Sequence, residues 1–564
     1  MHRRLTRVPM PVLTVICLCL VSVPSGLVPA AAGQDAAPKV MRFFWGDGFP
    51  DVLEPQQTES GTVDMTFLNY EGLTRYDEEL NVVPGAAESW AFNQDGTRIT
   101  FTLRENLTYS DGSPLLAERF RDAMVRQCDP HLDTFNVDNL SDVVGCAELN
   151  AVELNEDGSP VDAAAYEAAK SSFGARALDE RTLEIDLKKP APYFPALAAL
   201  NVSFMPIKQE LLNGWDPAQW FDPALWVGNG PFQVVEIEPE GSPRRITFVR
   251  NERYWGGKAK LDGIEYVVLP YDEAMQAYRD RTLTVMRPWE ESMPAIEADP
   301  VLSREVLRIW QPFVWMYNFN FNREPFTDQN VREAFAYAFD REAWCLQMQY
   351  GACSPHLSWI PSRVPGAIET DAFAFDPVAA RAALAASSYG GPEGLPEIIL
   401  YHQNDDPADF TQAEWIAEQY RQVLGVEMTL VPVTPDEQDA LMSSPETWPQ
   451  FAGTYWYSDM PDPHDWLEMW TCGSPFFAEN VGYCNPEYDA LVAQVDREMD
   501  PEARIRLAED AQRLLLADSP AIFGFTSPYI MLASPYLTGY NPAAPNQYWP
   551  GWWTPLTLDI TEPA

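Results

Sequence analysis

The sequence is poor in histidine and in positive charge. It contains 5 His among 564 residues, and its 38 Lys and Arg are outnumbered by 83 Asp and Glu, which gives a net charge of −45 at pH 7. Such an acidic surface repels phosphate backbones and anionic bilayers, so it argues against nucleic-acid binding. With few histidines and no Cys-x-x-Cys pair, the usual patterns of zinc ligands are missing. We predict no metal and no other cofactor.

Long apolar runs are also missing beyond the N-terminus. A membrane-spanning helix needs about 20 apolar residues, and no stretch after residue 32 meets this requirement. The N-terminus has three arginines in its first seven residues, an apolar stretch at 8–23 and a run of alanines at 30–32 that suits a signal peptidase. We predict that residues 1–32 are a secretory signal peptide and that the mature protein is exported. An N-terminal membrane anchor is the alternative.

Motifs for hydrolysis and phosphoryl transfer are absent as well. The sequence has no G-x-S-x-G, no H-E-x-x-H and no P-loop. Pairs of carboxylates are frequent, but they carry little information in a chain with 83 acidic residues. We therefore predict that the protein is not an enzyme, and a secreted hydrolase is the less favoured alternative.

Six of the eight cysteines lie beyond the signal peptide, in three close pairs. The pairs are Cys128 with Cys146, Cys345 with Cys353, and Cys472 with Cys484. An even number of closely spaced cysteines on an exported chain is typical of local disulfides. We predict these three bridges, although the sequence alone does not fix which cysteines pair.

The pattern of apolar residues predicts an α/β protein with two lobes. Hydrophobic residues make up 46% of a chain that is too long for one core. Alternating apolar residues indicate strands at 40–45, 96–104 and 179–187, and three more between 228 and 269. In the second half we expect a strand at 307–320, a helix at 330–348 and a strand–helix–strand unit at 398–432. The last unit implies a partly parallel sheet.

The expected helix at 330–348 has a clear inner and outer side. Asp328 is a suitable N-cap residue for it. The helical spacing places Phe335 and Phe339 towards the interior and Arg332 away from it.

Several collinear segments resemble the extracytoplasmic solute-binding proteins of peptide and nickel ABC importers, known as family 5. The segments are NYEGLTRYDEELNVVPGAAESW at 69–90, DGTRITFTLRENLTYSDGSPLLAERF at 95–120, GNGPFQVVEIEPEGSPRRITFVRNERYWGG from 228, NFNREPFTDQNVREAFAYAFDREA within 318–343, WYSDMPDPHDWLEMWTC at 456–472 and NPEYDALVAQVDREMDPEARIRLAEDAQRLL at 485–515. Each segment alone is weak, but together they span nearly the whole mature chain. One departure is RTLTV at 281–285, where the family usually has Gly-Glu-Ile-Asp.

The resemblance implies a two-lobed fold like that of periplasmic binding proteins, of type II and in the large peptide-binding class, with an extra first-lobe subdomain. On this basis we assign residues 33–73 and 187–275 to lobe I, residues 74–186 to the extra subdomain, residues 276–530 to lobe II, and residues 531–564 to a C-terminal return to lobe I.

The resemblance also implies a ligand site. In peptide-binding members the acid of a W-x-x-D motif pairs with the α-amino group of the ligand and the Trp walls the pocket, which gives these roles to Asp459 and Trp456, with Tyr455 beside them. The alternatives are that Asp459 only caps a turn, or that Asp459, Asp462, Asp465 and Glu468 bind a cation. The intervening prolines 461 and 463 argue against the cation.

A second contact is implied on lobe I. The segment around Glu59, Ser60 and Gly61 resembles the loop that reaches over the ligand in this family. An extended Ser60-Gly61 backbone would pair with a bound peptide as an added strand.

The function implied by the resemblance is capture and delivery. We expect the substrate-binding component of an ABC importer, which captures an oligopeptide or dipeptide between two lobes and delivers it to the membrane permease. Its partners are then the small ligand and the importer's membrane subunits. We expect a monomer located in the periplasm or at the extracytoplasmic surface. An oligosaccharide or a metallophore is the alternative ligand.

Overall fold

The computed structural model describes residues 38–46, 48–57, 62–132, 134–541, 544 and 554–561. The expected signal peptide at 1–32 lies outside the described residues, as do Glu59, Ser60 and Gly61. Within the described part of the chain, no helix is both long enough and apolar enough to span a membrane.

A mixed seven-stranded sheet forms the centre of lobe I. In order across the sheet, its strands are β12 (Val306–Ile309), β19 (Tyr529–Ala533), β11 (Val285–Met286), β1 (Val40–Gly46), β10 (Gly263–Val268), β9 (Arg244–Arg250) and β8 (Phe232–Glu238). β1 pairs in parallel with β10 and β11, and the remaining pairs are antiparallel. Lobe I thus draws strands from both ends of the chain.

A second sheet belongs to the extra subdomain of lobe I. Its antiparallel strands are β4 (Ala87–Phe92), β5 (Arg98–Leu103), β7 (Thr182–Asp186) and β6 (Ala175–Ala177). In β5, Ile99, Phe101 and Leu103 are buried and the residues between them are half-buried, as the alternating pattern predicts. The smaller pairs are β2 (Thr74–Tyr76) with β3 (Val82–Pro84) and β20 (Leu537–Thr538) with β21 (Asp559–Ile560).

Short helices cover these sheets. They are α1 (Val63–Asn69), α2 (Ala117–Gln127), α3 (Cys146–Asn150), α4 (Ala163–Ser171), α5 (Phe194–Leu200), α6 (Tyr271–Arg279) and α7 (Met293–Ala298). The buried apolar residues of the two sheets, α1, α2 and α5 join in one large core, which we call the lobe I core.

Lobe II contains two sheets. The first is antiparallel, in the order β14 (Ser354–Pro355), β18 (Ala521–Thr526), β13 (Phe313–Phe319) and β17 (Phe451–Tyr457). The second pairs β15 (Ile398–Gln403) with β16 (Met428–Val433) in parallel, through α11 (Pro407–Leu424), which confirms the expected strand–helix–strand unit. The other helices are α8 (Gln329–Ala338), α9 (Arg341–Gln347), α10 (Pro377–Ala386), α12 (Pro435–Leu441), α13 (Pro463–Leu467), α14 (Ala478–Val481), α15 (Pro486–Val495) and α16 (Pro501–Asp518).

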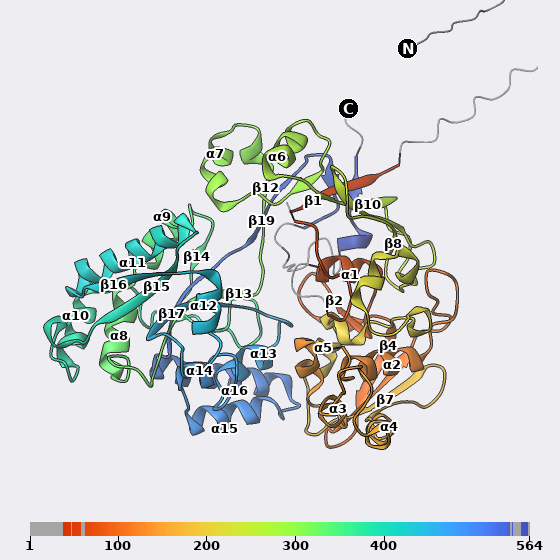
Figure 1. Cartoon of the computed structure of the whole chain (residues 1–564), viewed down its shortest axis with the longest axis horizontal. Coiled ribbons are helices and arrows are strands. Elements are labelled where there is room, and N and C mark those ends of the chain that lie inside the picture. The colour runs from red at the N-terminus through yellow and green to blue at the C-terminus, as the bar shows by residue number, and fades with distance from the viewer. Residues whose placement is uncertain are drawn as a thin grey trace, which may run out of the picture. The chain divides into compact units, whose positions relative to one another are not determined.

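Two short crossings, 310–312 and 527–528, join the sheets of the two lobes (Figure 1). The single strand expected at 307–320 is therefore wrong, because β12 belongs to lobe I and β13 to lobe II. Pro312, which lacks an N–H donor, lies at the break. The side chain of Gln311 donates to the Ser527 carbonyl at 3.0 Å and ties the crossings together. β11 and β12 follow residue 276, the start expected for lobe II, yet both belong to the lobe I sheet.

The helix expected at 330–348 is also divided. α8 ends at Ala338, and Asp340 caps α9 by accepting from the Ala343 N–H at 2.9 Å. Asp328 caps α8 as expected, and Phe335 and Phe339 are buried. The outward direction expected for Arg332 is wrong.

Arg332 is buried because it has partners inside the protein. Its guanidinium donates to the backbone carbonyls of Phe326, Asp518 and Ser519 at 2.9–3.2 Å. A buried charge is tolerated where such acceptors satisfy its donors.

The three predicted disulfides are confirmed. Cys128 bonds Cys146, Cys345 bonds Cys353, and Cys472 bonds Cys484. The first bridge joins the end of α2 to the start of α3. The third holds the segment that follows α13, next to the candidate site.

Candidate functional site

The segment after β17 carries the acidic residue singled out from the sequence. Asp465, on α13, organises it: its carboxylate accepts from the Trp456 indole N–H at 3.1 Å and from the Asp459 backbone N–H at 3.3 Å. Trp456 also packs edge-on against Phe476, with ring centroids 5.4 Å apart. The fold therefore brings Trp456 and Asp459 together through Asp465.

Tyr455 lies on the other face of the sheet. Successive side chains of a strand point to opposite faces, so Trp456 and Tyr455 diverge. Tyr455 is exposed and packs against Phe313, while Trp456 belongs to the core on the side of α13. The three residues proposed as one site thus form two groups, on either side of β17.

Three carboxyl groups around this segment hold protons more tightly than usual. Asp459 keeps contact with solvent, but the surrounding protein displaces much of its water and, together with the charge of Glu468, raises its pKa to about 6. Burial and the charge of Asp459 raise the pKa of Asp465 well above its ordinary value. Burial also raises the pKa of Glu468. The group has a surplus of negative charge: Asp465 is buried, whereas Asp459 and Glu468 keep contact with solvent.

His464 and Asp496 lie next to these acids. His464 Nδ1 is 2.7 Å from Asp496 Oδ1, and its Nε2 is 3.3 Å from Glu468 Oε2. Burial alone would lower the pKa of His464, but Asp496 and Glu468 together raise it to about 9. His464 is therefore a cation at neutral pH, and it partly offsets the surrounding acids.

Asp462 has a structural role in the segment. It caps α13 through the His464 N–H at 2.9 Å, and both of its oxygens receive the Arg504 guanidinium at 2.6 and 2.7 Å. Among the described residues, no group of three or more His, Cys, Asp or Glu side chains is arranged to hold a metal ion.

Lobe I contacts the same segment. Asn139 of lobe I lies near Asp459 and acts to lower its pKa, against the effects of burial and of Glu468. Met460 is buried within the lobe I core although it belongs to a lobe II loop. Asp459 therefore lies where the two lobes meet.

A cavity of about 370 Å³ lies at the crossings, and a second, of about 210 Å³, opens beside β17 at Gly453–Tyr455. The second is lined by Trp315 and Tyr317 of β13, and by side chains of α11, α12 and β15. Two buried polar atoms of its lining residues, the acceptor Gln438 Oε1 and the hydroxyl Thr454 Oγ1, have no hydrogen-bond partner among the described residues. β17 is the last strand of its sheet in the described part of the chain, with no further strand hydrogen-bonded to it, and it lines this cavity together with the nearby β15.

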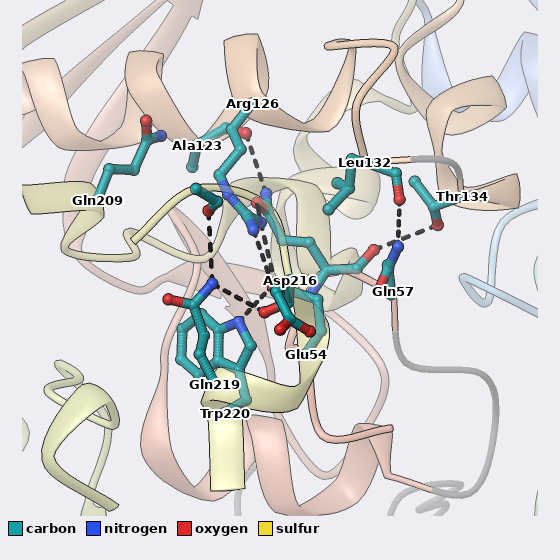
Figure 2. A network of polar contacts seen from close by, with 12 residues as sticks. Glu54, Gln57, Ala123, Arg126, Leu132, Thr134, Gln209, Asp216, Gln219 and Trp220 are labelled. Atoms are coloured by element: carbon teal, nitrogen blue, oxygen red, sulfur yellow. Dashed lines mark hydrogen bonds and ion pairs between the residues drawn. The ribbon is translucent and has the colours of Figure 1, made fainter. Parts of the chain in front are cut away.

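A buried network fixes the lobe I loop that precedes residues 58–61 (Figure 2). Arg126 donates to both oxygens of Glu54 at 3.0 and 2.7 Å, and the Trp220 indole N–H donates to the same carboxylate. Side chains of Gln57 and Thr134 then bond the loop to the segment after α2, through the Leu132 and Gln56 carbonyls. Glu54 and Arg126 are almost fully buried.

Sequence reasoning considered Asp465 and Glu468 only as cation ligands and did not identify Asn139 at all. The clustering of acids in the 456–472 segment was a usable signal for the first two. Asn139 lies about 320 positions before Asp459, by the difference of their numbers, and nothing in its local sequence marks it.

The comparisons with known proteins agree with this fold. The family model for bacterial extracellular solute-binding proteins, family 5 (middle), matches residues 81–477, so the chain belongs to that family. The dipeptide-binding protein DppE of Bacillus subtilis (strain 168) is 28% identical over 473 residues, 80% of each chain. The probable deoxycholate-binding periplasmic protein YgiS of Escherichia coli (strain K12) is 28% identical over 533 residues, 92% of this chain and 94% of its own.

Solved structures show the same architecture. The unliganded open form of the periplasmic murein tripeptide-binding protein MppA superimposes with a TM-score of 0.76 at 22% identity, and covers 93% of this chain and 98% of that chain. The two-lobed α/β fold expected from the sequence is confirmed.

Proposed function

We propose that the protein is the substrate-binding component of an ABC importer, which captures an oligopeptide or dipeptide between its lobes and delivers it to the membrane permease. Membership of the family supports the class of protein. The observation that supports a peptide as the ligand is the group of acidic residues where the lobes meet, which consists of Asp459, Asp465 and Glu468. A ligand ammonium placed there gains a charge-assisted contact and relieves repulsion among the carboxylates.

The edge of β17 supports a peptide rather than a simple amine. Unpaired N–H and C=O groups on an edge strand accept an added strand, which binds the ligand through its backbone. Starting from Asp459, a ligand strand would pass Tyr455 about 13 Å further along, given a rise of about 3.3 Å per residue. Its side chains would alternate between the cavity beside Tyr455 and the side of Trp456.

The proposal also covers where the protein works and what happens to its ligand. The protein works outside the cytoplasm, in the periplasm or at the cell surface, as a monomer. It binds its ligand reversibly and releases it chemically unchanged.

A bile acid is the second candidate ligand, because a relative of similar identity is named as a probable deoxycholate-binding protein. The acidic group argues against it, since a steroid carboxylate would meet Asp459 and Glu468 with the same sign of charge. Deoxycholate is therefore the natural competitor in a binding test.

The test is calorimetry with dialanine, trialanine, N-acetylated trialanine and deoxycholate. We expect the free peptides to bind and the acetylated one to bind far more weakly. Asp459→Ala should weaken peptide binding by about 2–5 kcal/mol, because it removes one partner of a desolvated charge pair. Asp272→Ala, an exposed acid on α6, is the matched control and should change nothing.

Two results would contradict the proposal. If the free and acetylated peptides bind with equal affinity, the α-amino group of the ligand does not contact the acidic residues. Saturable binding of deoxycholate without peptide binding would favour the second candidate. Mass spectrometry of the recovered peptide checks that it is uncleaved.

A further inference from the structure

We infer that Lys189 and Tyr193 of lobe I and His464 and Asp496 of lobe II form a latch, which holds the lobes together without touching ligand and sets the closed fraction of the free protein. The latch itself does not depend on the proposed ligand. Only its effect on affinity rests on the proposed function.

The first half of the latch is a pair of stacked rings. The rings of Tyr193 and His464 are nearly parallel, at 7°, with centroids 3.7 Å apart. Tyr193 is held from lobe I, since it is buried in the lobe I core and its hydroxyl donates to Asp142. His464 is held from lobe II by Asp496. Each ring is therefore fixed by its own lobe, and the contact between them joins the lobes.

The second half is a shared carboxylate. Lys189 Nζ lies 3.1 Å from Asp496 Oδ2 and 3.5 Å from Asp142 Oδ2. The other oxygen of Asp496 faces His464. Asp496 thus binds a cation from each lobe at once, and Lys189 binds an anion from each lobe at once. Both side chains are largely shielded, so solvent screens these contacts less than it does at an open surface.

The arrangement strengthens both contacts. A cationic ring stacked on a tyrosine gains from the negative face of the aromatic system. The charged groups around His464 are Asp496, Glu468 and Lys189, with Asp142 behind Tyr193 and Arg504 6.0 Å from the Tyr193 ring. If the lobes separate, the ion pair between Lys189 and Asp496 breaks, and the Tyr193 ring loses its stacking contact with His464.

The latch bears on ligand binding through the population of closed protein. Apparent affinity falls in proportion to the fraction of protein that is competent to bind. The latch also adjoins the acidic group, because Glu468 lies beside His464 and raises the pKa of Asp459. Groups that never contact the ligand can therefore change its affinity.

The experiment measures lobe separation in ligand-free protein. Spin labels at Glu167→Cys and Arg506→Cys, one exposed position in each lobe, report the distance distribution. Lys189→Met keeps an unbranched side chain, one atom shorter, and removes its charge. We expect the closed-to-open ratio to fall roughly fivefold or more, the effect of losing an ion pair of about 1 kcal/mol. Lys188→Met, at the exposed neighbouring lysine, is the control and should leave the distribution unchanged.

Variants at Tyr193 separate the latch from folding. Tyr193→Phe keeps the ring and should retain most of the closed population, whereas Tyr193→Leu should lose it. Melting curves of each variant identify any that fail to fold. Unchanged distances in both Lys189→Met and a folded Tyr193→Leu would overturn the latch. If Lys189→Met opens the protein while the wild-type protein binds none of the peptides, the latch stands and the proposed function is rejected.

Discussion

At the scale of single residues, the charge of Asp459 changes within a biologically relevant pH range. Its pKa is about 6 in the ligand-free protein, raised by lost hydration and by Glu468. An ammonium ion binds the carboxylate and not the neutral acid. Binding therefore competes with protonation of the same group.

We expect peptide affinity to be highest near pH 7, between the pKa of Asp459 and that of the ligand's α-amino group at about 8, and to fall as the pH drops through about 6. Below that value each pH unit should cost up to about tenfold, because binding must displace one proton. Calorimetry between pH 4.5 and 8 measures this, and heats in buffers of different ionisation enthalpy count the released proton. Asp459→Asn should bind weakly and lose this pH dependence. A wild-type affinity that is flat across pH 6 would contradict the assignment.

Residue roles were only partly predictable. The resemblance proposes Asp459 and Trp456 as ligand contacts because a short motif carries both, and these roles stay predictions. Tyr455 was grouped with them, although strict alternation along a strand already places it on the opposite face. Lys189 and Tyr193 left no local signal, since their partners in lobe II lie about 270 to 310 positions away by residue number. Arg332 was misplaced because a helical wheel does not show the backbone carbonyls that receive its guanidinium.

At the scale of elements, Arg126 at the end of α2 holds the lobe I loop. We expect Arg126→Leu to lower the free energy of unfolding by about 3–5 kcal/mol, because it leaves the Glu54 carboxylate buried without its partner. Urea denaturation measures the change. Arg506→Leu, at an exposed arginine on α16, should cost less than about 1 kcal/mol.

A double variant sharpens this test. Arg126→Leu with Glu54→Leu removes both charges and should recover much of the lost stability. If the double variant is no more stable than the single one, the cost arises from packing and not from the unpaired carboxylate.

The elements show where local patterns succeed and where they fail. Alternation located β5 well, and the order of apolar segments revealed the parallel pair β15 and β16. The prediction of a single strand at 307–320 failed because apolar residues that favour strands continue through both β12 and β13. The sheet that each strand joins depends on its pairing partner, which the local sequence does not show. Pro312, and Asp340 within the expected helix, were the available signs of a break.

At the scale of the whole molecule, ligand binding should change the relation of the lobes. A ligand that contacts both lobes shifts the balance towards closure by its differential affinity. We expect small-angle scattering to show a smaller radius of gyration with saturating peptide than without it. Asp459→Ala at the same peptide concentration should scatter like the free protein. Identical wild-type profiles, with binding verified by calorimetry, would exclude closure.

The two crossings also show how the second lobe is inserted into the chain of the first. Ile309, where the chain leaves the lobe I sheet, is the register partner of Tyr529, where it returns. Everything between them is thus an insertion whose entry and exit meet at one rung of a β-ladder. A two-residue turn could join these ends into an ordinary hairpin. The first lobe therefore has the layout of a self-contained module, into which the second lobe is inserted as a domain.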